Sequence, residues 1–147
     1  MKKVLILGIA PVQTDAIKEL NKTGIQVYAC AKENDGPGSK YVYRFEKVNF
    51  LEEEKVIEFI LSEGIECVYS VGSDIAMPIC SSISEKLGLP HFITSKVAKI
   101  CNNKVKLRDC LGNNFDGNIC YQVLNDKADN IEIEYPFIMK PADSQGQ

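Results

Sequence analysis

The stretch KVLILGIAPVQTDAIKELNKTGIQVYACA, residues 3–31, decides the fold. Its apolar run over 3–8 predicts a buried strand, and a second apolar strand is expected over 25–31. Between them, Gly24 ends a segment whose apolar residues recur at helical spacing: Ala16, Ile17 and Leu20. Strand, helix and strand in this order indicate a right-handed crossover between parallel strands.

The same unit continues to about residue 90. A short strand is predicted over 41–45 and a clearer one over 65–71, while Asn49 and Glu52 form a capping-box pattern ahead of the intervening helix. The two further helices each end at a glycine, and their apolar faces contain Val56, Phe59, Ile60, Ala76, Ile79, Cys80, Ile83 and Leu87. Because apolar strands alternate with amphipathic helices, we predict an α/β domain with a doubly wound, mainly parallel, Rossmann-like sheet.

The pattern changes near residue 93, where we place a boundary between domains 1–93 and 94–147. Ser95 is the expected cap of the first helix of the second part. The predicted elements there are helices over 95–101 and 104–111 and strands over 119–124 and 137–140. Two strands without further partners do not make a self-sufficient sheet, so 94–147 is predicted to be an incomplete α+β lobe.

Composition argues against several classes of protein. The net charge of −3 over 147 residues argues against nucleic acid as the main partner. The longest apolar runs are too short to cross a bilayer, and the start of the chain has the pattern of a first strand, not of a signal peptide. The single His91 cannot build a metal cluster alone. The six cysteines form no CxxC pair and indicate reduced thiols in a cytoplasmic protein, with four expected in the core: Cys30, Cys67, Cys80 and Cys120.

Two loops of the first domain are candidate binding residues, because ligands of open α/β sheets bind at the carboxyl ends of the strands. The first follows the opening strand, and the second, 72–74, follows the strand predicted over 65–71. The first is not a dinucleotide fingerprint, because Ala10 and Pro11 stand where a second glycine is needed. The alternative is that both loops are only well-made helix starts. The candidate residues are Gly8, Ala10, Pro11, Gln13, Gly72, Ser73 and Asp74.

Lys140 stands at the end of a predicted buried strand, ahead of Pro141 and a small-residue loop over 142–146. A fixed cation followed by the N–H groups of a loop can hold phosphates, although the P-loop motif is absent. The alternative is a lysine that extends from the strand end into water. Lys104 shares a predicted helix face with Arg108, in an acid-free basic run for which a solvated helix face is the usual explanation.

Three stretches in this order resemble the N-terminal part of an ATP-grasp enzyme of the carbamoyl-phosphate synthase-like branch. SVGSDIAMPICSSISEKLGLP, residues 70–90, is similar to the family's pre-ATP-grasp domain. ICNNKVKLRDCL, residues 100–111, resembles the segment in which a basic residue heads a helix before the nucleotide lobe. YPFIMKPADSQGQ, residues 135–147, resembles the strand, lysine and phosphate loop of that lobe. The loop has fewer glycines than in some branches, and the turn after Leu111 lacks the common Gly-x-Pro pattern.

The resemblance implies roles for several residues. Lys104 would contact the ATP phosphates, and Lys140 would reach the phosphates and the adenine edge. The loop that closes over the γ-phosphate would include Ser144, Gln145 and Gly146. The two candidate loops of the first domain would face a carboxylate substrate. This carboxylate attacks the γ-phosphate of ATP to give an acylphosphate, and an amine or other nucleophile then displaces phosphate from the acylphosphate. The Mg²⁺ ligands of the family are expected beyond residue 147, and no catalytic residue is assigned.

The resemblance therefore implies that residues 1–147 do not catalyse the reaction alone and are a fragment, a proteolytic remnant or a truncated product of an ATP-dependent ligase. It also admits a homodimer, and it leaves the carboxylate and the nucleophile open. The main alternative is a stand-alone Rossmann-like module that binds a small anionic metabolite without ATP chemistry. A third, a nicotinamide or sugar-nucleotide protein, is disfavoured by the missing second glycine.

Overall fold

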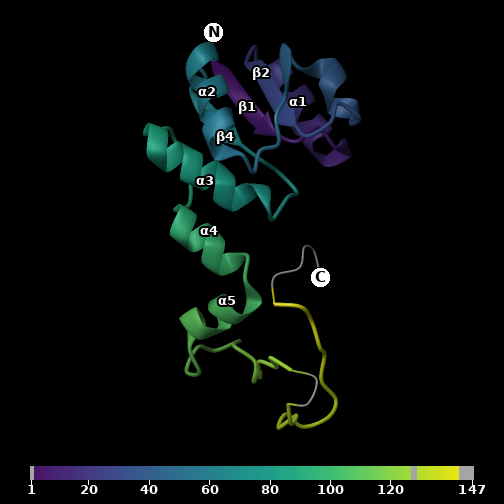
Figure 1. Ribbon diagram of the computed structural model, residues 1–147, viewed down its shortest axis with the longest axis vertical. Helices are drawn as coiled ribbons and strands as arrows, with labels where there is room; N and C mark the ends of the chain where they lie inside the picture. The colour runs from purple at the N-terminus through teal and green to yellow at the C-terminus, as the bar shows by residue number, and fades with distance from the viewer. Residues whose placement is uncertain (1, 127–128, 143–147) are drawn as a thin grey trace. The chain divides into compact units, whose positions relative to one another are not determined.

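The computed structural model describes residues 2–126 and 129–142, and the chain divides into two compact units, Met1–Ala98 and Lys99–Gln147 (Figure 1). The boundary predicted near residue 93 lies a few residues before this division. None of the helices in the described ranges has the length and apolarity that crossing a bilayer requires.

The first unit contains a sheet of four strands, all parallel, in the order β3-β2-β1-β4. The strands are β1 (Lys3–Leu7), β2 (Gln26–Ala31), β3 (Arg44–Lys47) and β4 (Cys67–Tyr69). In the register of the sheet, Leu5 lies between Tyr28 and Val68. The predicted α/β class and parallel sheet are therefore confirmed.

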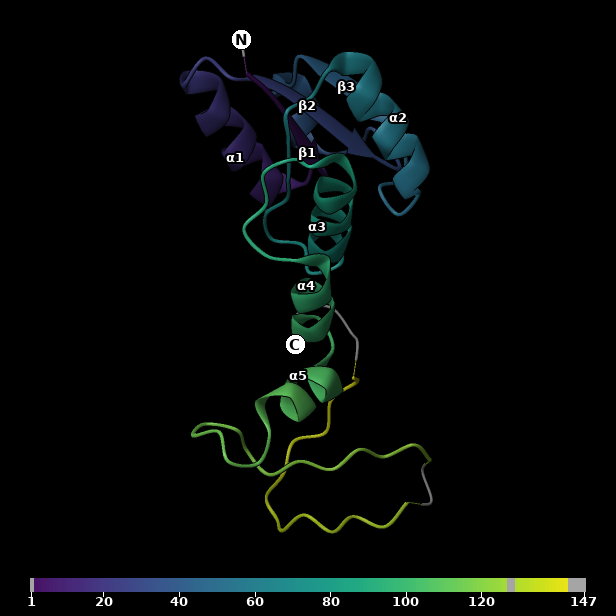
Figure 2. The same cartoon turned by 90° about the vertical axis from the view of Figure 1, so that its left-hand side faces the viewer.

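Helices cover both faces of this sheet. Helix α1 (Pro11–Lys22) lies on one side of the strands and α2 (Glu53–Glu63) on the other, as Figure 2 shows. Helix α3 (Ala76–Leu87) packs with α2 on the second face, and the short 3₁₀ helix η1 (Pro37–Tyr41) precedes β3. This arrangement follows from strands that are apolar on both sides.

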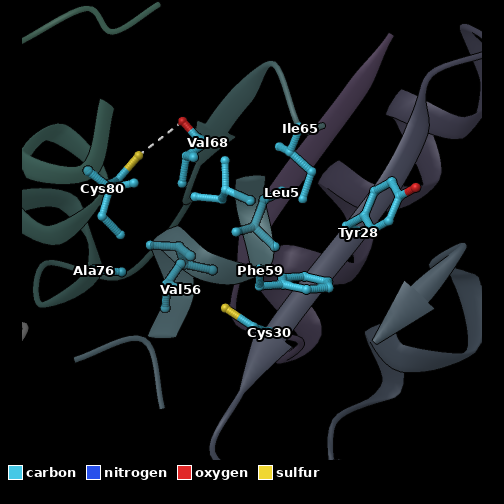
Figure 3. Close-up of a cluster of buried hydrophobic side chains, with 12 residues drawn as sticks. Leu5, Tyr28, Cys30, Val56, Phe59, Ile65, Val68, Ala76 and Cys80 are labelled. Carbon is cyan, nitrogen blue, oxygen red and sulfur yellow. Dashed lines mark hydrogen bonds between the residues drawn. The ribbon is translucent and has the colours of Figure 1, made fainter. Parts of the chain in front are cut away.

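The side chains of β1 alternate between two hydrophobic clusters because successive residues of a strand point to opposite faces. Ile6 packs with Ile17 and Val27 under α1. Leu5 and Leu7 belong to the larger cluster under α2 and α3, which Figure 3 shows with Phe59 and its neighbours.

Buried thiols are part of this larger cluster. The Cys80 Sγ donates to the carbonyl oxygen of Val68 at 3.1 Å, drawn as a dashed line in Figure 3. Burial raises the pKa of the Cys30 and Cys80 thiols to about 12. All six cysteines are free, Cys67 is half-buried, and Cys120 is exposed, so the expectation that Cys120 lies in the core was wrong.

Three local predictions in the first unit need correction. Asn49 does not make a capping box, because its Oδ1 accepts from the N–H of Leu51 at 3.1 Å and closes a turn before α2 begins. The strand predicted over 41–45 begins later, at Arg44, because η1 occupies Tyr41. The strand predicted over 65–71 is reduced to β4.

Two short helices follow, α4 (Ser95–Cys101) and α5 (Lys104–Leu111). Ser95 does not cap α4: the Oγ1 of Thr94 accepts from Val97 N–H at 3.2 Å, while Ser95 donates to Glu85. The Oδ1 of Asn103 caps α5 by accepting from Lys106 N–H at 2.9 Å.

No strand is present at 119–124 or 137–140, where two were predicted; Figure 2 draws both segments as coil. Ile138 is 82% exposed and Met139 66%, so the strand expected to be buried ahead of Lys140 is not buried. The side chain of Gln122 replaces part of a strand ladder by accepting from Glu132 N–H at 2.8 Å. No residue that the structure describes in Lys99–Gln147 is buried, so these apolar segments have no core to pack into.

Candidate functional site

The strand order places a topological switch point between β1 and β4. From β1 the chain moves through β2 to β3 in one direction, and it then returns to add β4 on the other side of β1. Ligands of open α/β sheets bind at such a point, in the crevice beyond the carboxyl ends of the strands. The loop after β1 with the first turn of α1, and the turn after β4, contain the seven candidate residues of the first domain. We use the name switch-point crevice for residues 8–13 and 72–74 at this edge of the sheet.

The turn that leaves β1 requires a glycine. Gly8 has a φ of +105°, and its N–H donates to the Cys30 carbonyl at 2.9 Å. A Cβ at this position would lie 3.3 Å from the Cδ and Oε1 of Gln13. The turn and the side chain of Gln13 are therefore fitted closely to each other.

Gln13 is 4% exposed and connects the two loops. Its Nε2 donates to the Val71 carbonyl at 2.5 Å. Its Oε1 is buried and has no hydrogen-bond partner among the residues that the structure describes. Gln13 therefore does not present a free amide to solvent, as a direct ligand to an anion would.

The loop that leaves β4 is also shaped by a glycine. Gly72 has a φ of +65°, and a Cβ there would lie 2.7 Å from the Cγ2 of Val12. The Oγ of Ser73 accepts from the N–H of Ala76, the first residue of α3, at 3.3 Å, while Ile75 occupies the N-cap position of that helix. Asp74 is exposed and so can meet a ligand.

The N-terminus of α1 has no side-chain cap. Ala10 occupies the N-cap position, Pro11 follows it, and the first turn contains no acidic residue. The first N–H groups of a helix have no partner within the helix and carry partial positive charge, which attracts anions. Ala10 and Pro11 are exposed, so this end of α1 is open to solvent.

Two features near the crevice were not predicted from the sequence. One is the loop after β2, where Gly38 N–H donates to the Ile9 carbonyl at 3.0 Å and a Cβ on Gly36 would lie 2.3 Å from the same oxygen. The Gly-Pro-Gly sequence of this loop was the available signal. The other is apolar: Val12 is 45% exposed and Ile75 44% exposed, at the start of α1 and just ahead of α3.

The second unit contains a concavity of about 890 Å³. Lys104 and Lys140, 36 positions apart in the sequence, both line it, and the N–H of Lys104 donates to the Ala142 carbonyl at 2.8 Å. Arg108, which we had not assigned to a site, lines the same concavity and donates to the Asn118 Oδ1 at 3.0 Å. Its other lining residues are mostly apolar, among them Leu107, Ile131, Ile133, Phe137 and Met139.

Lys140 is exposed in an irregular segment and does not end a strand, which corrects the geometry predicted for it. The predicted phosphate-loop residues Ser144, Gln145 and Gly146 lie outside the described residues. Within residues 2–126 and 129–142, there is no group of three His, Cys, Asp or Glu side chains that could hold a metal ion.

No protein-family model matches the sequence, and no curated protein does. Solved structures do match. Phosphoribosylglycinamide synthetase from Anaerococcus prevotii aligns over 75% of this chain with a TM-score of 0.67 and 18% identity. L-amino acid ligase from Bacillus licheniformis aligns over 76% with a TM-score of 0.62 and 21% identity. N5-carboxyaminoimidazole synthetase from Staphylococcus aureus, solved with ADP, aligns over 75% with a TM-score of 0.62 and 14% identity.

The chain spans only 28% of the first and third of these proteins and 29% of the second. All three are ATP-grasp enzymes. At these identities the similarity establishes the fold, which is that of the N-terminal part of ATP-grasp enzymes, as the sequence resemblance implied.

Proposed function

We propose that this chain is the N-terminal portion of an ATP-dependent ligase that activates a carboxylate as an acylphosphate and transfers it to an amine or a related nucleophile. The observation that carries the proposal is that Lys104 and Lys140 line one concavity in a chain whose fold is that of the N-terminal part of ATP-grasp enzymes. The crevice of the first unit is then the place for the carboxylate substrate.

In this proposal the basic residues of the concavity bind the phosphates of ATP. Ammonium and guanidinium groups form charge-assisted hydrogen bonds with phosphate oxygens and stabilise the charge that spreads during phosphoryl transfer. The apolar lining supplies a surface for the adenine base. Ser144, Gln145 and Gly146 remain the proposed residues of the closing loop.

The family's Mg²⁺ does not fit the described residues, which offer no suitable cluster of carboxylates. We therefore propose that residues 1–147 alone do not complete the reaction. The six free thiols support a reducing compartment, so we propose a cytoplasmic enzyme.

Nucleotide binding to the chain tests the proposal. Isothermal titration with ATP should give saturable binding that Lys104→Ala and Lys140→Ala each weaken by roughly 10-fold to 100-fold, the effect of losing one hydrogen bond to a charged group. Lys106→Ala is the matched control, because Lys106 belongs to the same basic run and does not line the concavity. Equal weakening by all three variants would mean diffuse attraction and would contradict a specific phosphate site.

A second test concerns the crevice. In the complete enzyme, Asp74→Asn should raise the KM for the carboxylate substrate and leave the KM for ATP unchanged, because Asp74 belongs to the first unit and Lys104 to the second. Steady-state kinetics with each substrate varied in turn would measure this. An increase in the KM for ATP alone would show that the turn is wrongly assigned.

The uncapped start of α1 favours a second candidate function, a module that binds a small anionic metabolite without ATP chemistry. Binding of such an anion to the intact chain, unchanged by Lys140→Ala and without any ATP binding, would support this candidate over the ligase.

A further inference from the structure

One buried side chain connects the two walls of the switch-point crevice. We propose that Gln13 is a positioning residue that holds the 71–74 turn against the first turn of α1, so that the crevice is already formed before a ligand binds. This positioning stands on the geometry alone, whereas its use by a carboxylate substrate rests on the proposed function.

The chemistry of the buried amide supports a positioning role. The Nε2 of Gln13 bonds the Val71 carbonyl, while its Oε1 is buried without a partner among the described residues. A buried polar atom without a partner is unfavourable, and an apolar side chain of similar length would fill the same space without it. The benefit of glutamine at this position therefore lies in its bond to Val71.

The hydrogen bond between Gln13 and Val71 lies just beyond the last residue of β4, where the hydrogen bonds of the sheet end. Strand β4 ends at Tyr69, and the Ser70 Oγ then donates to the Leu7 carbonyl at 3.1 Å. The bond to Val71 comes one residue later and fastens the chain to α1. Beyond the end of the ladder, two successive side-chain bonds thus attach the chain that leaves β4, first to β1 and then to α1.

Two glycines make this close approach possible. The missing Cβ of Gly8 leaves room for the Gln13 amide, and the missing Cβ of Gly72 lets the turn lie against Val12. The turns that leave β1 and β4 therefore pack against adjacent residues of α1. Together these contacts fix the spacing between the uncapped start of α1 and Asp74.

Hydrogen exchange of the intact chain, read by NMR for individual amides, tests the proposal without any ligand. In Gln13→Met, which keeps length and burial and removes the donor, the amides of Ala76 and Met77 should exchange roughly 10-fold faster, the effect of losing about one hydrogen bond. These two amides report on the turn because they donate to the Oγ and the carbonyl oxygen of Ser73. The amides of Leu5 and Val68, inside the sheet, should keep their protection. The matched control is Thr14→Val, because Thr14 is buried on the same helix and its Oγ1 bonds Ala10, not the turn.

Gln13→Glu distinguishes a hydrogen-bonding role of this side chain from a general packing role. A protonated carboxyl can donate to the Val71 carbonyl, whereas an ionised carboxylate cannot. Protection of the Ala76 and Met77 amides, corrected for the intrinsic pH dependence of exchange, should be close to that of the unmodified chain below the pKa of the introduced carboxyl and should fall above it. Burial should raise that pKa above its usual range. Gln13→Met should show no such recovery at any pH.

Three outcomes would overturn the proposal. Unchanged exchange in the turn of Gln13→Met would mean that the bond does not hold it. Loss of protection throughout the sheet would mean that Gln13 stabilises the core in general. A Gln13→Glu variant whose turn shows no pH dependence would also refute it, and this variant retains the donor at acid pH if the methionine variant fails to fold. A failure to bind ATP would refute the proposed ligase function and leave these exchange results unaffected.

Discussion

Gly36→Ala should be strongly destabilising although Gly36 has an ordinary backbone conformation. Its φ is −92° and its ψ 152°, values that any residue adopts, so the substitution adds no backbone strain. The added Cβ would lie 2.3 Å from the carbonyl oxygen of Ile9 and 2.7 Å from the carbonyl carbon. Because these are main-chain atoms, no side-chain rotation relieves the overlap, and the loop after β2 must move away from the loop after β1.

The magnitude follows from two contributions. Forcing extra volume into a well-packed site costs about 1–3 kcal/mol. Moving the loop also lengthens the 3.0 Å bond from Gly38 N–H to the Ile9 carbonyl, which is worth about 1 kcal/mol. We therefore expect a loss of about 2–4 kcal/mol in the free energy of unfolding, a large part of the ~5–15 kcal/mol that holds a typical domain together.

Gly64→Ala is the matched control. Gly64 ends α2 with a φ of +63°, and nothing lies within 4 Å of the place where its Cβ would be. Alanine there meets only the strain of the left-handed region, about 1 kcal/mol. Urea unfolding followed by far-UV circular dichroism would compare the two variants. If Gly36→Ala costs no more than Gly64→Ala, the contact between the two loops is not as tight as described, and the reasoning fails.

Further predictions concern the thiols and the start of α3. At mildly alkaline pH a disulfide reagent should label the exposed thiols of Cys101, Cys110 and Cys120 first, and Cys30 and Cys80 only on unfolding; rapid labelling of five or more thiols by native protein would contradict this burial. Burial raises the pKa of Cys30 and of Cys80 from 9.0 to about 12. Their contribution to stability is therefore complete below pH 9 and falls as the pH rises toward 12, because in this range the thiols ionise in the unfolded chain and not in the folded one. Urea midpoints measured across this range would show the decline. Ser73→Ala should cost roughly 0.5–1 kcal/mol in urea unfolding because Ala76 N–H loses its acceptor, and an unchanged midpoint would show that water replaces it.

The core of the first unit could be predicted from the sequence because the spacing of apolar residues along a segment indicates which of its side chains are buried. The apolar run of β1 and the spacing of Ile17 with its neighbours were enough to place a strand and the helix beside it. The predicted capping box was wrong because the same residue type is common both at helix caps and in turns. Asn49 was expected to cap a helix and instead closes a turn, since a short polar side chain can bond either way.

Contacts between distant segments could not be predicted in the same way. The Gln13 side chain bonds a carbonyl 58 positions away, and nothing near Gln13 in the sequence indicates Val71 as its partner. The strands expected around Ile119 and Ile138 have suitable side chains, but a strand also needs a neighbour to pair with. An alternating apolar pattern shows that a segment can form a strand, but it does not show that a neighbouring strand is there to pair with it.

The strand order also has a consequence for the order of folding. Pairing β1 with β2 closes a loop that contains little more than α1, whereas pairing β1 with β4 closes one that also contains β2, β3 and α2. The entropy of loop closure favours the shorter connection, so we expect the β1–β2 half to form first and β4 to dock onto it afterwards. The crevice lies at the end of the β1–β4 pair, which is the pair that forms later. A variant that weakens the docking of β4 would therefore lose its binding site while most of the sheet remains folded.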